Sequence, residues 1–455
     1  MNKDEILELK IEDIGTDGEG IGHVDGYTLF VKDALPGDVV KAKVIKAKKS
    51  YGYGRLLEVI EASPDRCEAK CPVARACGRC QIQHMDYAAQ LRMKQKRVKD
   101  CFSRIGGFEE SFIDSVMHEI IGMEKPWHYR NKAQFPVGLN KEGKAVTGFY
   151  AGRTHSVIDT PHCFIQFEEN DAIMEAVRGF IDKEHISVYN EETGKGLVRH
   201  VLTRKGFATD EIAVCIIINE DKVPKAEKLV ESLLSACPKI KSITFNVNKE
   251  KTNVILGEKT EVLYGSEYIY DYIGDVRFRI SPKSFFQVNP VQTKVLYGLA
   301  LDLAKKDTDL KNLTVWDLYC GIGTISLFLA KEAGHVHGVE IVPAAIEDAK
   351  ENAKLNGITN AKFYVGAAED VAPSLPKPDV IVVDPPRKGC DEKLLATILK
   401  HNPPKVVYVS CDPATLARDV KILCEGGYKL TYLQPVDQFG HTVHVESLAL
   451  LTKSS

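Results

Sequence analysis

A cysteine follows an apolar segment at a point where a strand is expected to end and a helix to begin. Cys411 comes directly after residues 406–410 (VVYVS) and before Asp412-Pro413. In doubly wound α/β sheets, such carboxyl ends of strands bind small molecules and carry reacting groups. The dipole and the unpaired amides at the start of a helix favour the thiolate form of a cysteine. A buried structural cysteine is the alternative, but the flanking residues favour Cys411 as the nucleophile among the twelve cysteines.

A glycine-containing loop is predicted at the end of an earlier strand of the same kind. Asp317-Leu318-Tyr319-Cys320-Gly321-Ile322-Gly323 joins an apolar strand to a helix, and Glu340 ends the next strand. Glycines let a ligand approach the backbone, and an acidic residue at this distance can accept ribose hydroxyl groups. The third glycine of the dinucleotide pattern is missing, which disfavours a dehydrogenase. The D-x-x-x-G-x-G pattern resembles the S-adenosylmethionine loop of class I methyltransferases.

A third strand end carries Asp384-Pro385-Pro386-Arg387. In enzymes that methylate exocyclic amines, a similar motif ends in an aromatic residue that stacks on the base. Arg387 at that position indicates a different methyl acceptor. Carbon 5 of uracil is a suitable one if a thiolate first adds to carbon 6 and a base later removes the carbon 5 proton. Glu446, in the last predicted strand, is the candidate base, and a carboxylate facing water at a strand edge is the alternative.

Taken together, these residues resemble the RNA 5-methyluridine methyltransferase family. The motifs that carry the resemblance are Ser284-Phe285-Phe286-Gln287-Val288-Asn289, Asp317-Leu318-Tyr319-Cys320-Gly321, Asp384-Pro385-Pro386-Arg387, Ser410-Cys411-Asp412-Pro413-Ala414-Thr415-Leu416-Ala417-Arg418-Asp419 and His444-Val445-Glu446-Ser447. The resemblance implies that Cys411 is the nucleophile and Glu446 the proton acceptor. It also implies a binding site for S-adenosylmethionine formed by Gln287, Tyr319, Gly321, Glu340 and Asp384.

A dense group of cysteines precedes these motifs. Cys71, Cys77 and Cys80 are spaced Cys-x5-Cys-x2-Cys, with Cys67 just before them. Zinc would favour two Cys-x2-Cys pairs, whereas three close thiolates and a remote fourth can hold an iron–sulfur cluster. The pattern resembles the 4Fe–4S site in the ribosomal RNA branch of the family, which implies Cys71, Cys77, Cys80 and Cys163 as ligands. Cys67 is left out, although it could compete for the site.

Residues 1–62 contain short predicted strands separated by Gly and Asp turns, which is typical of a small barrel. The third of these strands is basic, and Tyr51 and Tyr53 follow it. Cations beside aromatic faces suit RNA binding, although a barrel with a charged exterior would look similar. The segment resembles the TRAM domain, an OB-like RNA-binding barrel that comes first in the ribosomal RNA branch.

The rest of the chain is predicted to form two further domains and a helical connection. Residues 63–85 and 117–280 indicate a central, mainly antiparallel α+β domain that contains the cysteine loop. Residues 86–116 contain a basic helical segment, which we expect to pack on the catalytic domain. In residues 281–455, strands alternate with helices, as in the Rossmann-like fold of class I methyltransferases. The predicted fold class is therefore multidomain: a barrel, an α+β domain and an α/β domain.

The composition is that of an ordinary soluble protein, and the net charge of −3 gives no overall attraction to nucleic acid. RNA binding must therefore be local, and Arg130 and Lys132 are possible contacts, with an ordinary charged surface as the alternative. The sequence shows neither a signal peptide nor an apolar run long enough to span a membrane. Twelve cysteines without a secretion signal indicate a reducing cytosol. We expect a cytoplasmic monomer that does not bind membranes.

The leading prediction is an enzyme that uses S-adenosylmethionine to methylate carbon 5 of one or two uridines in 23S ribosomal RNA. A transfer-RNA uridine-5 methyltransferase is the nearest alternative, although that branch usually lacks the barrel and the cysteine group. A radical iron–sulfur methylthiotransferase also carries a TRAM barrel, but its Cys-x3-Cys-x2-Cys spacing is absent here. A non-catalytic RNA-binding factor is the last alternative, and the intact Cys411, Glu446 and Gly321 argue against it.

Overall fold

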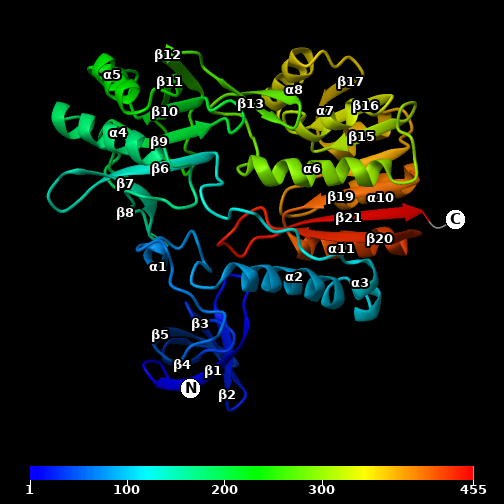
Figure 1. Ribbon diagram of the computed structural model, residues 1–455, viewed down its shortest axis with the longest axis horizontal. Coiled ribbons are helices and arrows are strands. Elements are labelled where there is room, and N and C mark those ends of the chain that lie inside the picture. Colours follow the sequence, from blue (N-terminus) through cyan, green and yellow to red (C-terminus); the bar gives the residue numbers. More distant parts are fainter. Residues whose placement is uncertain (153, 454–455) are drawn as a thin grey trace.

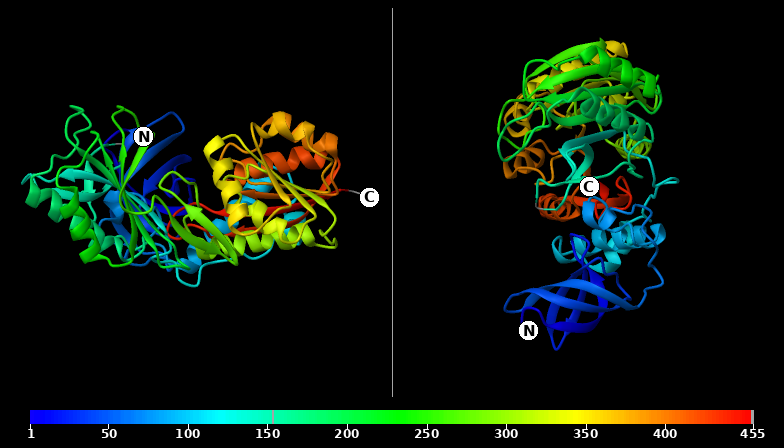
Figure 2. Two further views of the ribbon diagram at one scale, coloured as in Figure 1. Left: turned by 90° about the horizontal axis from the view of Figure 1, so that it is seen from above. Right: turned by 90° about the vertical axis from the view of Figure 1, so that its left-hand side faces the viewer.

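The computed structural model describes residues 1–152 and 154–453. It has an amino-terminal barrel, a central sheet covered by helices, and a carboxyl-terminal α/β domain (Figure 1). Figure 2 shows the barrel at one end of the molecule, with the central sheet and the α/β domain side by side beyond it. Among the described helices, none has the length and apolar composition needed to traverse a lipid bilayer.

The barrel is closed, with its strands in the order β1-β2-β3-β5-β4. The strands are β1 (Ile6–Ile14), β2 (Gly20–Val24), β3 (Tyr27–Lys32), β4 (Val39–Ala47) and β5 (Tyr51–Glu61). Alternate apolar residues of β1, β3 and β4 fill its interior, which closes the barrel around a small core. Strand β2 was not predicted, because its sequence GIGHV is short and rich in glycine.

A helical segment connects the barrel to the rest of the molecule. It comprises α1 (Ala74–Cys77), α2 (Tyr87–Arg104) and α3 (Glu110–Val116). Helix α2 begins where the Asp86 side chain accepts a hydrogen bond from the Ala89 amide at 3.1 Å. Every fourth residue on one face is buried: Gln90, Lys94, Val98 and Phe102. This face packs mainly on α11 of the α/β domain, so α2 forms part of the layer that covers the catalytic sheet.

The central sheet has seven strands in the order β12-β11-β10-β9-β6-β7-β8. The strands are β6 (Lys132–Leu139), β7 (Ala145–Tyr150), β8 (Val157–Asp159), β9 (Val198–Lys205), β10 (Ile212–Ile218), β11 (Ile240–Val247) and β12 (Lys259–Gly265). Helices α4 (Asn170–Glu184) and α5 (Ala226–Ala236) pack their apolar residues against one face. The sheet is antiparallel as expected except for β10 and β11, which are parallel because α5 connects them as a crossover.

The hairpin of β13 (Ile269–Ile273) and β14 (Val276–Ile280) shares its core with α6 and α8 of the α/β domain. The boundary predicted at residue 280 assigned this hairpin to the central domain. Its apolar residues Ile269, Val276 and Phe278 instead pack in the larger carboxyl-terminal core.

The α/β domain is built on a seven-stranded sheet in the order β17-β16-β15-β18-β19-β21-β20. Its strands are β15 (Thr314–Leu318), β16 (His335–Glu340), β17 (Ala361–Val365), β18 (Val380–Val383), β19 (Lys405–Ser410), β20 (Tyr428–Val436) and β21 (Glu446–Lys453). Its helices are α6 (Pro290–Lys305), α7 (Thr324–Ala330), α8 (Pro343–Leu355), α9 (Ala368–Val371), a short 3-10 helix (Ala372–Ser374), α10 (Glu392–His401) and α11 (Pro413–Glu425). The first five strands in the sheet order are parallel, and β21 runs antiparallel to β19.

This topology brings distant sequence segments to one edge of the sheet. The carboxyl ends of the parallel strands lie at that edge, and so does the amino end of β21, since β21 runs the opposite way. Ser410 of β19 is paired with Ser447 of β21. Cys411 directly follows Ser410, and Glu446 directly precedes Ser447. The two residues therefore lie at the same place on the edge of the sheet.

Candidate active site

A cavity of about 850 Å³ lies at the carboxyl edge of the catalytic sheet. All seven residues predicted for catalysis and cofactor binding line it, although they come from six different segments of the chain. They are Gln287, Tyr319, Gly321, Glu340, Asp384, Cys411 and Glu446. The cavity thus has the position that open α/β sheets use for ligands.

The loop after β15 has the backbone shape that its glycines predict. Gly321 and Gly323 have φ values of 55° and 82°, in the left-handed region that glycine adopts without strain. A Cβ atom at Gly323 would lie 3.2 Å from side-chain atoms of Ala349 and Phe363, so the loop is tightly packed there. At Gly321 no atom would meet a Cβ within 4 Å, which leaves the loop open towards a ligand.

The Glu340 carboxylate is held in place by the backbone. Its Oε2 accepts a hydrogen bond from the Gly321 amide at 3.2 Å, and its Oε1 accepts one from the Val342 amide at 2.9 Å. Each carboxylate oxygen has a further lone pair to offer. Glu340 can therefore accept ribose hydroxyl groups without moving.

Two carboxyls, the buried Glu446 and the partly buried Asp384, lie in the same cavity. Burial, followed by the charge of Asp384, raises the pKa of Glu446 to about 8. Burial, followed by the charge of Asp317, raises the pKa of Asp384 to about 7. A group whose pKa lies near neutral pH can both accept and release a proton under working conditions, as a general base must.

The thiol of Cys411 faces these carboxyls, and its pKa differs from the prediction. Burial, followed by the charges of Glu446 and Asp384, raises the pKa of Cys411 to about 11. This direction is opposite to the expected thiolate character, because burial and the two carboxyls disfavour the charged sulfur. In addition, the start of α11 is already occupied. The Asp412 carboxylate accepts hydrogen bonds from the amides of Ala414 (2.9 Å) and Thr415 (3.1 Å). The capping carboxylate takes the amides that would have stabilised a thiolate.

Comparisons with known proteins agree with this geometry. Residues 3–57 match the model of the TRAM domain, and residues 309–439 match that of a methyltransferase domain. An uncharacterized RNA methyltransferase of Halalkalibacterium halodurans is 54% identical, and the match covers 99% of this chain and 98% of the relative. Another from Bacillus cereus is 52% identical over 100% of this chain and 98% of the relative.

A solved structure matches along almost the whole chain. It is the tRNA (uracil-54, C5)-methyltransferase of Pyrococcus abyssi in complex with S-adenosyl-L-homocysteine. The TM-score is 0.80 at 28% identity, and the match covers 98% of this chain and 100% of that one. The chain belongs to the RNA uracil-5 methyltransferase family. This RNA methyltransferase is S-adenosylmethionine-dependent, and the resemblance predicted from its motifs is confirmed. The relatives give no support to a methylthiotransferase.

Further residues of this RNA methyltransferase line the cavity without having been predicted. They include Tyr297 of α6, together with Phe439 and His444 from the segment that precedes β21. The Tyr297 hydroxyl accepts a hydrogen bond from Thr324 at 3.3 Å. Burial, followed by the charge of Arg387, lowers the pKa of His444 to about 4. His444 stands two residues before Glu446 in the His444-Val445-Glu446-Ser447 motif, which is a signal for a site residue, whereas Tyr297 lies in an ordinary amphipathic helix that gives no signal.

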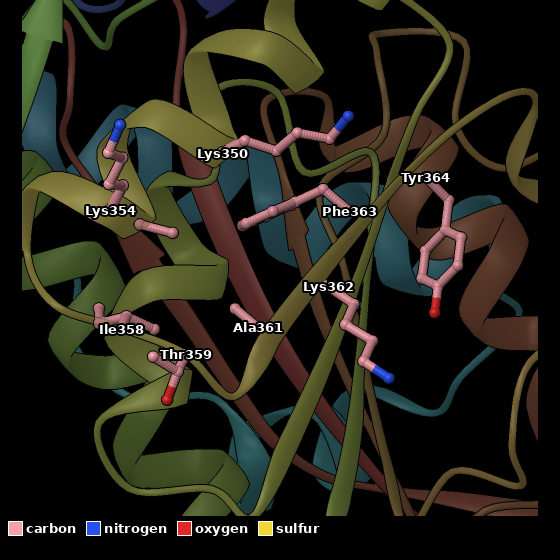
Figure 3. Close-up of a pocket in the computed structure, with 9 residues that line it drawn as sticks. Lys350, Lys354, Ile358, Thr359, Ala361, Lys362, Phe363 and Tyr364 are labelled. Atoms are coloured by element: carbon pink, nitrogen blue, oxygen red, sulfur yellow. The ribbon is translucent and has the colours of Figure 1, made fainter.

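A second hollow in the surface, of about 560 Å³, lies between α8 and the edge strand β17 (Figure 3). Its lining includes Lys350, Lys354 and Lys362, and none of the predicted site residues. We assign it no part in the chemistry of the active site.

The predicted iron–sulfur ligands lie close enough to influence one another. Burial, followed by the charges of Cys163, Cys77 and Cys71, raises the pKa of Cys80 to about 12. Cys67 is not among the groups that act on Cys80, and its own pKa is raised by burial and then by Asp86. In residues 1–152 and 154–453, however, no group of three or more His, Cys, Asp or Glu side chains has an arrangement that could hold a metal ion.

Proposed function

We propose that this RNA methyltransferase methylates carbon 5 of a uridine in 23S ribosomal RNA through a transient bond between Cys411 and carbon 6. One observation carries the proposal: Cys411 and Glu446 line the same cavity as the Gly321 loop and Glu340. This chemistry needs a nucleophile, a base and a methyl donor around a single ring.

The Cys411 thiol loses its proton to solvent, and its sulfur bonds to carbon 6 of the uracil while the electrons of the 5,6 double bond move to the carbonyl at carbon 4. S-adenosylmethionine, when bound, supplies the electrophilic methyl group that carbon 5 takes up, and S-adenosylhomocysteine leaves with the electron pair of the broken sulfur–carbon bond. Glu446 then removes the proton from carbon 5, the double bond forms again, and the Cys411 sulfur leaves.

The charges around the thiol suit these roles of Cys411 and Glu446. Arg387 lowers the pKa of both Cys411 and Glu446, whereas the neighbouring carboxyls raise them. A high pKa makes the Cys411 sulfur a strong nucleophile once it has lost its proton, but it keeps the thiol inert in the empty enzyme. A Glu446 carboxyl with a pKa of about 8 binds the proton from carbon 5 more tightly than an ordinary carboxylate would.

The donor site in this proposal combines Gln287, Tyr319, Gly321, Glu340 and Asp384. Glu340 offers oxygen atoms for ribose hydroxyl groups, and the open backbone at Gly321 accepts close approach of the ligand. Calorimetric titration with S-adenosylhomocysteine tests it: Glu340→Ala should weaken binding, whereas Cys411→Ala should not.

Transfer RNA is the second candidate substrate, and the Pyrococcus abyssi protein favours it. The expected distinction was that the transfer-RNA branch usually lacks the barrel and the cysteine group. A tRNA enzyme matched over 98% of this chain shows that the presence of an amino-terminal barrel does not by itself favour ribosomal RNA. The case for 23S ribosomal RNA rests on the cysteine pattern.

Mapping methylated uridines in cells with and without the gene separates the two substrates. Loss of 5-methyluridine from 23S ribosomal RNA, with transfer RNA unchanged, supports the proposal. Loss from transfer RNA alone would replace it with the second candidate.

Fractionation of the same cells tests the expected cytoplasmic location, and sedimentation of the purified protein tests the expected monomer.

We also propose that Cys71, Cys77, Cys80 and Cys163 hold a 4Fe–4S cluster. Four thiolates are the donor set of such a cluster, and the effect of Cys163, Cys77 and Cys71 on the pKa of Cys80 supports their proximity. A cluster of four irons is wider than one ion, so its thiolates stand further apart than the ligands of a single metal. Such a cluster would tie the loop of α1 to the loop between β8 and α4, which contains Cys163.

Anaerobically purified protein should contain about four irons per chain if the cluster forms. Cys80→Ala should lose the iron and its visible absorption, whereas the matched control Cys67→Ala should keep both. Zinc without iron in the wild-type protein would contradict the cluster.

A further inference from the structure

Three basic side chains gather where the central sheet meets the catalytic domain, and we call Arg130, Lys132 and Arg204 the basic cluster. Lys132 of β6 and Arg204 of β9 are direct partners in the antiparallel register. Like charges directly opposite each other on neighbouring strands are destabilising. In residues 1–152 and 154–453, none of the three forms an ion pair with a carboxylate.

The neighbouring residue on β9, Lys205, does have acidic partners. Lys205 points to the other face of the sheet, as the alternation of a strand requires. Its Nζ lies 2.6 Å from a Glu169 oxygen and 3.0 Å from an Asp210 oxygen. The face that carries Lys132 and Arg204 lacks such compensation within the described residues.

Arg204 is a buried cation with an unused donor. Its side chain is 2% exposed, one guanidinium NH₂ group donates to the Ser284 carbonyl, and its Nε has no partner in the described part of the chain. A charged donor that is buried without a partner destabilises the fold by more free energy than a hydrogen bond to it would supply. Burial, followed by the charges of Arg204 and Arg130, lowers the pKa of Lys132 to about 7. An anion would satisfy both residues.

The basic cluster is attached directly to a segment that lines the active-site cavity. The Asn131 amide, between two members of the cluster, donates to the Val288 carbonyl at 2.8 Å. The Asn131 side chain donates to the Gln287 carbonyl at 3.0 Å. Ser284 and Gln287 both line the cavity that contains Cys411. An anion at the cluster would therefore lie beside the cavity.

We propose that the basic cluster is a phosphate-binding subsite that holds the RNA backbone of a nucleotide next to the methylated one. Arginine and lysine are the residues that contact phosphates in RNA complexes, and such contacts fix position without reading sequence. The subsite goes beyond the proposed function, and it rests on RNA being the substrate rather than on which RNA or which carbon is methylated. The methionine carboxylate of the methyl donor is the other anion that could reach the same cations.

Salt-dependent RNA binding tests the subsite. The probe is a fluorescein-labelled, uridine-containing single-stranded oligoribonucleotide, titrated by anisotropy between about 50 and 200 mM salt. The variants are Arg130→Gln, Lys132→Gln and the two together, with Arg204→Lys as a variant that keeps the charge. Lys311→Gln is the matched control, because this exposed lysine lies just before β15, at the sheet edge opposite the cavity.

Each lost phosphate contact should reduce the slope of log affinity against log salt by about 0.7, so the double variant should lose about 1.4. Affinity for S-adenosylhomocysteine, measured by calorimetry, should remain that of the wild type. If the double variant has the same slope as Lys311→Gln, the proposal is overturned. It is also overturned if the double variant loses affinity for S-adenosylhomocysteine while its RNA binding is unchanged. Because the assay measures binding and not methylation, it stands even if the target proves not to be carbon 5 of a ribosomal uridine.

Discussion

Replacing Glu446 with Gln should make the fold more stable at alkaline pH, although it removes the proposed base. Glu446 is 3% exposed, and burial followed by Asp384 raises its pKa from 4.5 to about 8. A carboxyl that holds its proton more tightly when folded stabilises the fold fully below pH 4.5, the value for the unfolded chain. That stability is lost as the pH rises through about 8, when the folded carboxyl must also ionise. Gln does not ionise, so the variant keeps its stability over this range.

The size of the effect follows from the two pKa values. The rise from 4.5 to about 8 corresponds to about 5 kcal/mol, at about 1.4 kcal/mol for each pKa unit. The wild type should lose up to this amount of free energy of unfolding, relative to Glu446→Gln, between pH 4.5 and 8.5. Other groups titrate in both proteins and largely cancel from the difference.

Urea unfolding followed by tryptophan fluorescence measures this difference. The chain has two tryptophans, Trp127 and Trp316. Trp316 is fully buried in the catalytic sheet, so a Trp127→Phe background makes the fluorescence report on that domain. The two proteins are compared at pH 5, 6.5 and 8.5, with Glu332→Gln as a control for replacing a solvent-accessible carboxylate.

The expected result is a stability difference that grows with pH in favour of Glu446→Gln and stays flat for Glu332→Gln. A flat difference for both variants would refute the reasoning. Glu446 would then be ionised in the folded protein at neutral pH, and its burial could not have prepared it to accept a proton.

Two further predictions concern pH and the buried ion pair on α2. The rate of methyl transfer should rise as the pH increases through about 8, because Glu446 must lose its proton to act as a base. The Cys411 thiol, with a pKa of about 11, should extend the rise to higher pH. A single-turnover pH profile that is flat through about pH 8 would contradict the role of Glu446. Lys94→Met should lower the free energy of unfolding by about 3–5 kcal/mol, because it leaves the Asp437 carboxylate buried and without its partner. The two atoms Lys94 Nζ and Asp437 Oδ1 are 2.6 Å apart, and both side chains are fully buried. In urea unfolding, adding Asp437→Asn should recover part of the loss, whereas a loss below 1 kcal/mol in Lys94→Met would count against the pair.

Much of the catalytic domain could be predicted because its strands are short, apolar and regularly spaced. Apart from Gln287, which lies just before α6, the residues predicted for catalysis and cofactor binding stand at or near strand ends, and a parallel sheet brings such ends to one edge. The pairing of Ser410 with Ser447 is what places Cys411 and Glu446 together. The proximity of Cys411 and Glu446 therefore follows from the order of the strands in the sheet and not from any local sequence pattern.

Other features depend on contacts that no local pattern records. Strand β9 is buried along nearly its whole length, yet it contains Arg199, His200 and Arg204. Because of these polar residues, its sequence did not predict a buried strand. The pKa of Cys411 depends on carboxyls contributed by distant strands and on the capping by Asp412. Lys94 lies in the basic helical segment that was expected to pack on the catalytic domain, but its burial against Asp437, more than 300 residues later in the chain, leaves no local pattern in the sequence.

The bond between Cys411 and the uracil ring is the part of the proposed chemistry most open to direct measurement. Glu446→Gln protein, incubated with substrate RNA and S-adenosylmethionine, should accumulate a covalent adduct that migrates slowly in a denaturing gel. Digestion of that band and mass spectrometry should find a methylated uridine attached to Cys411, and Cys411→Ala should abolish both the band and methyl transfer while it still binds S-adenosylhomocysteine. Attachment at any other residue, or wild-type turnover by Cys411→Ala, would contradict the account.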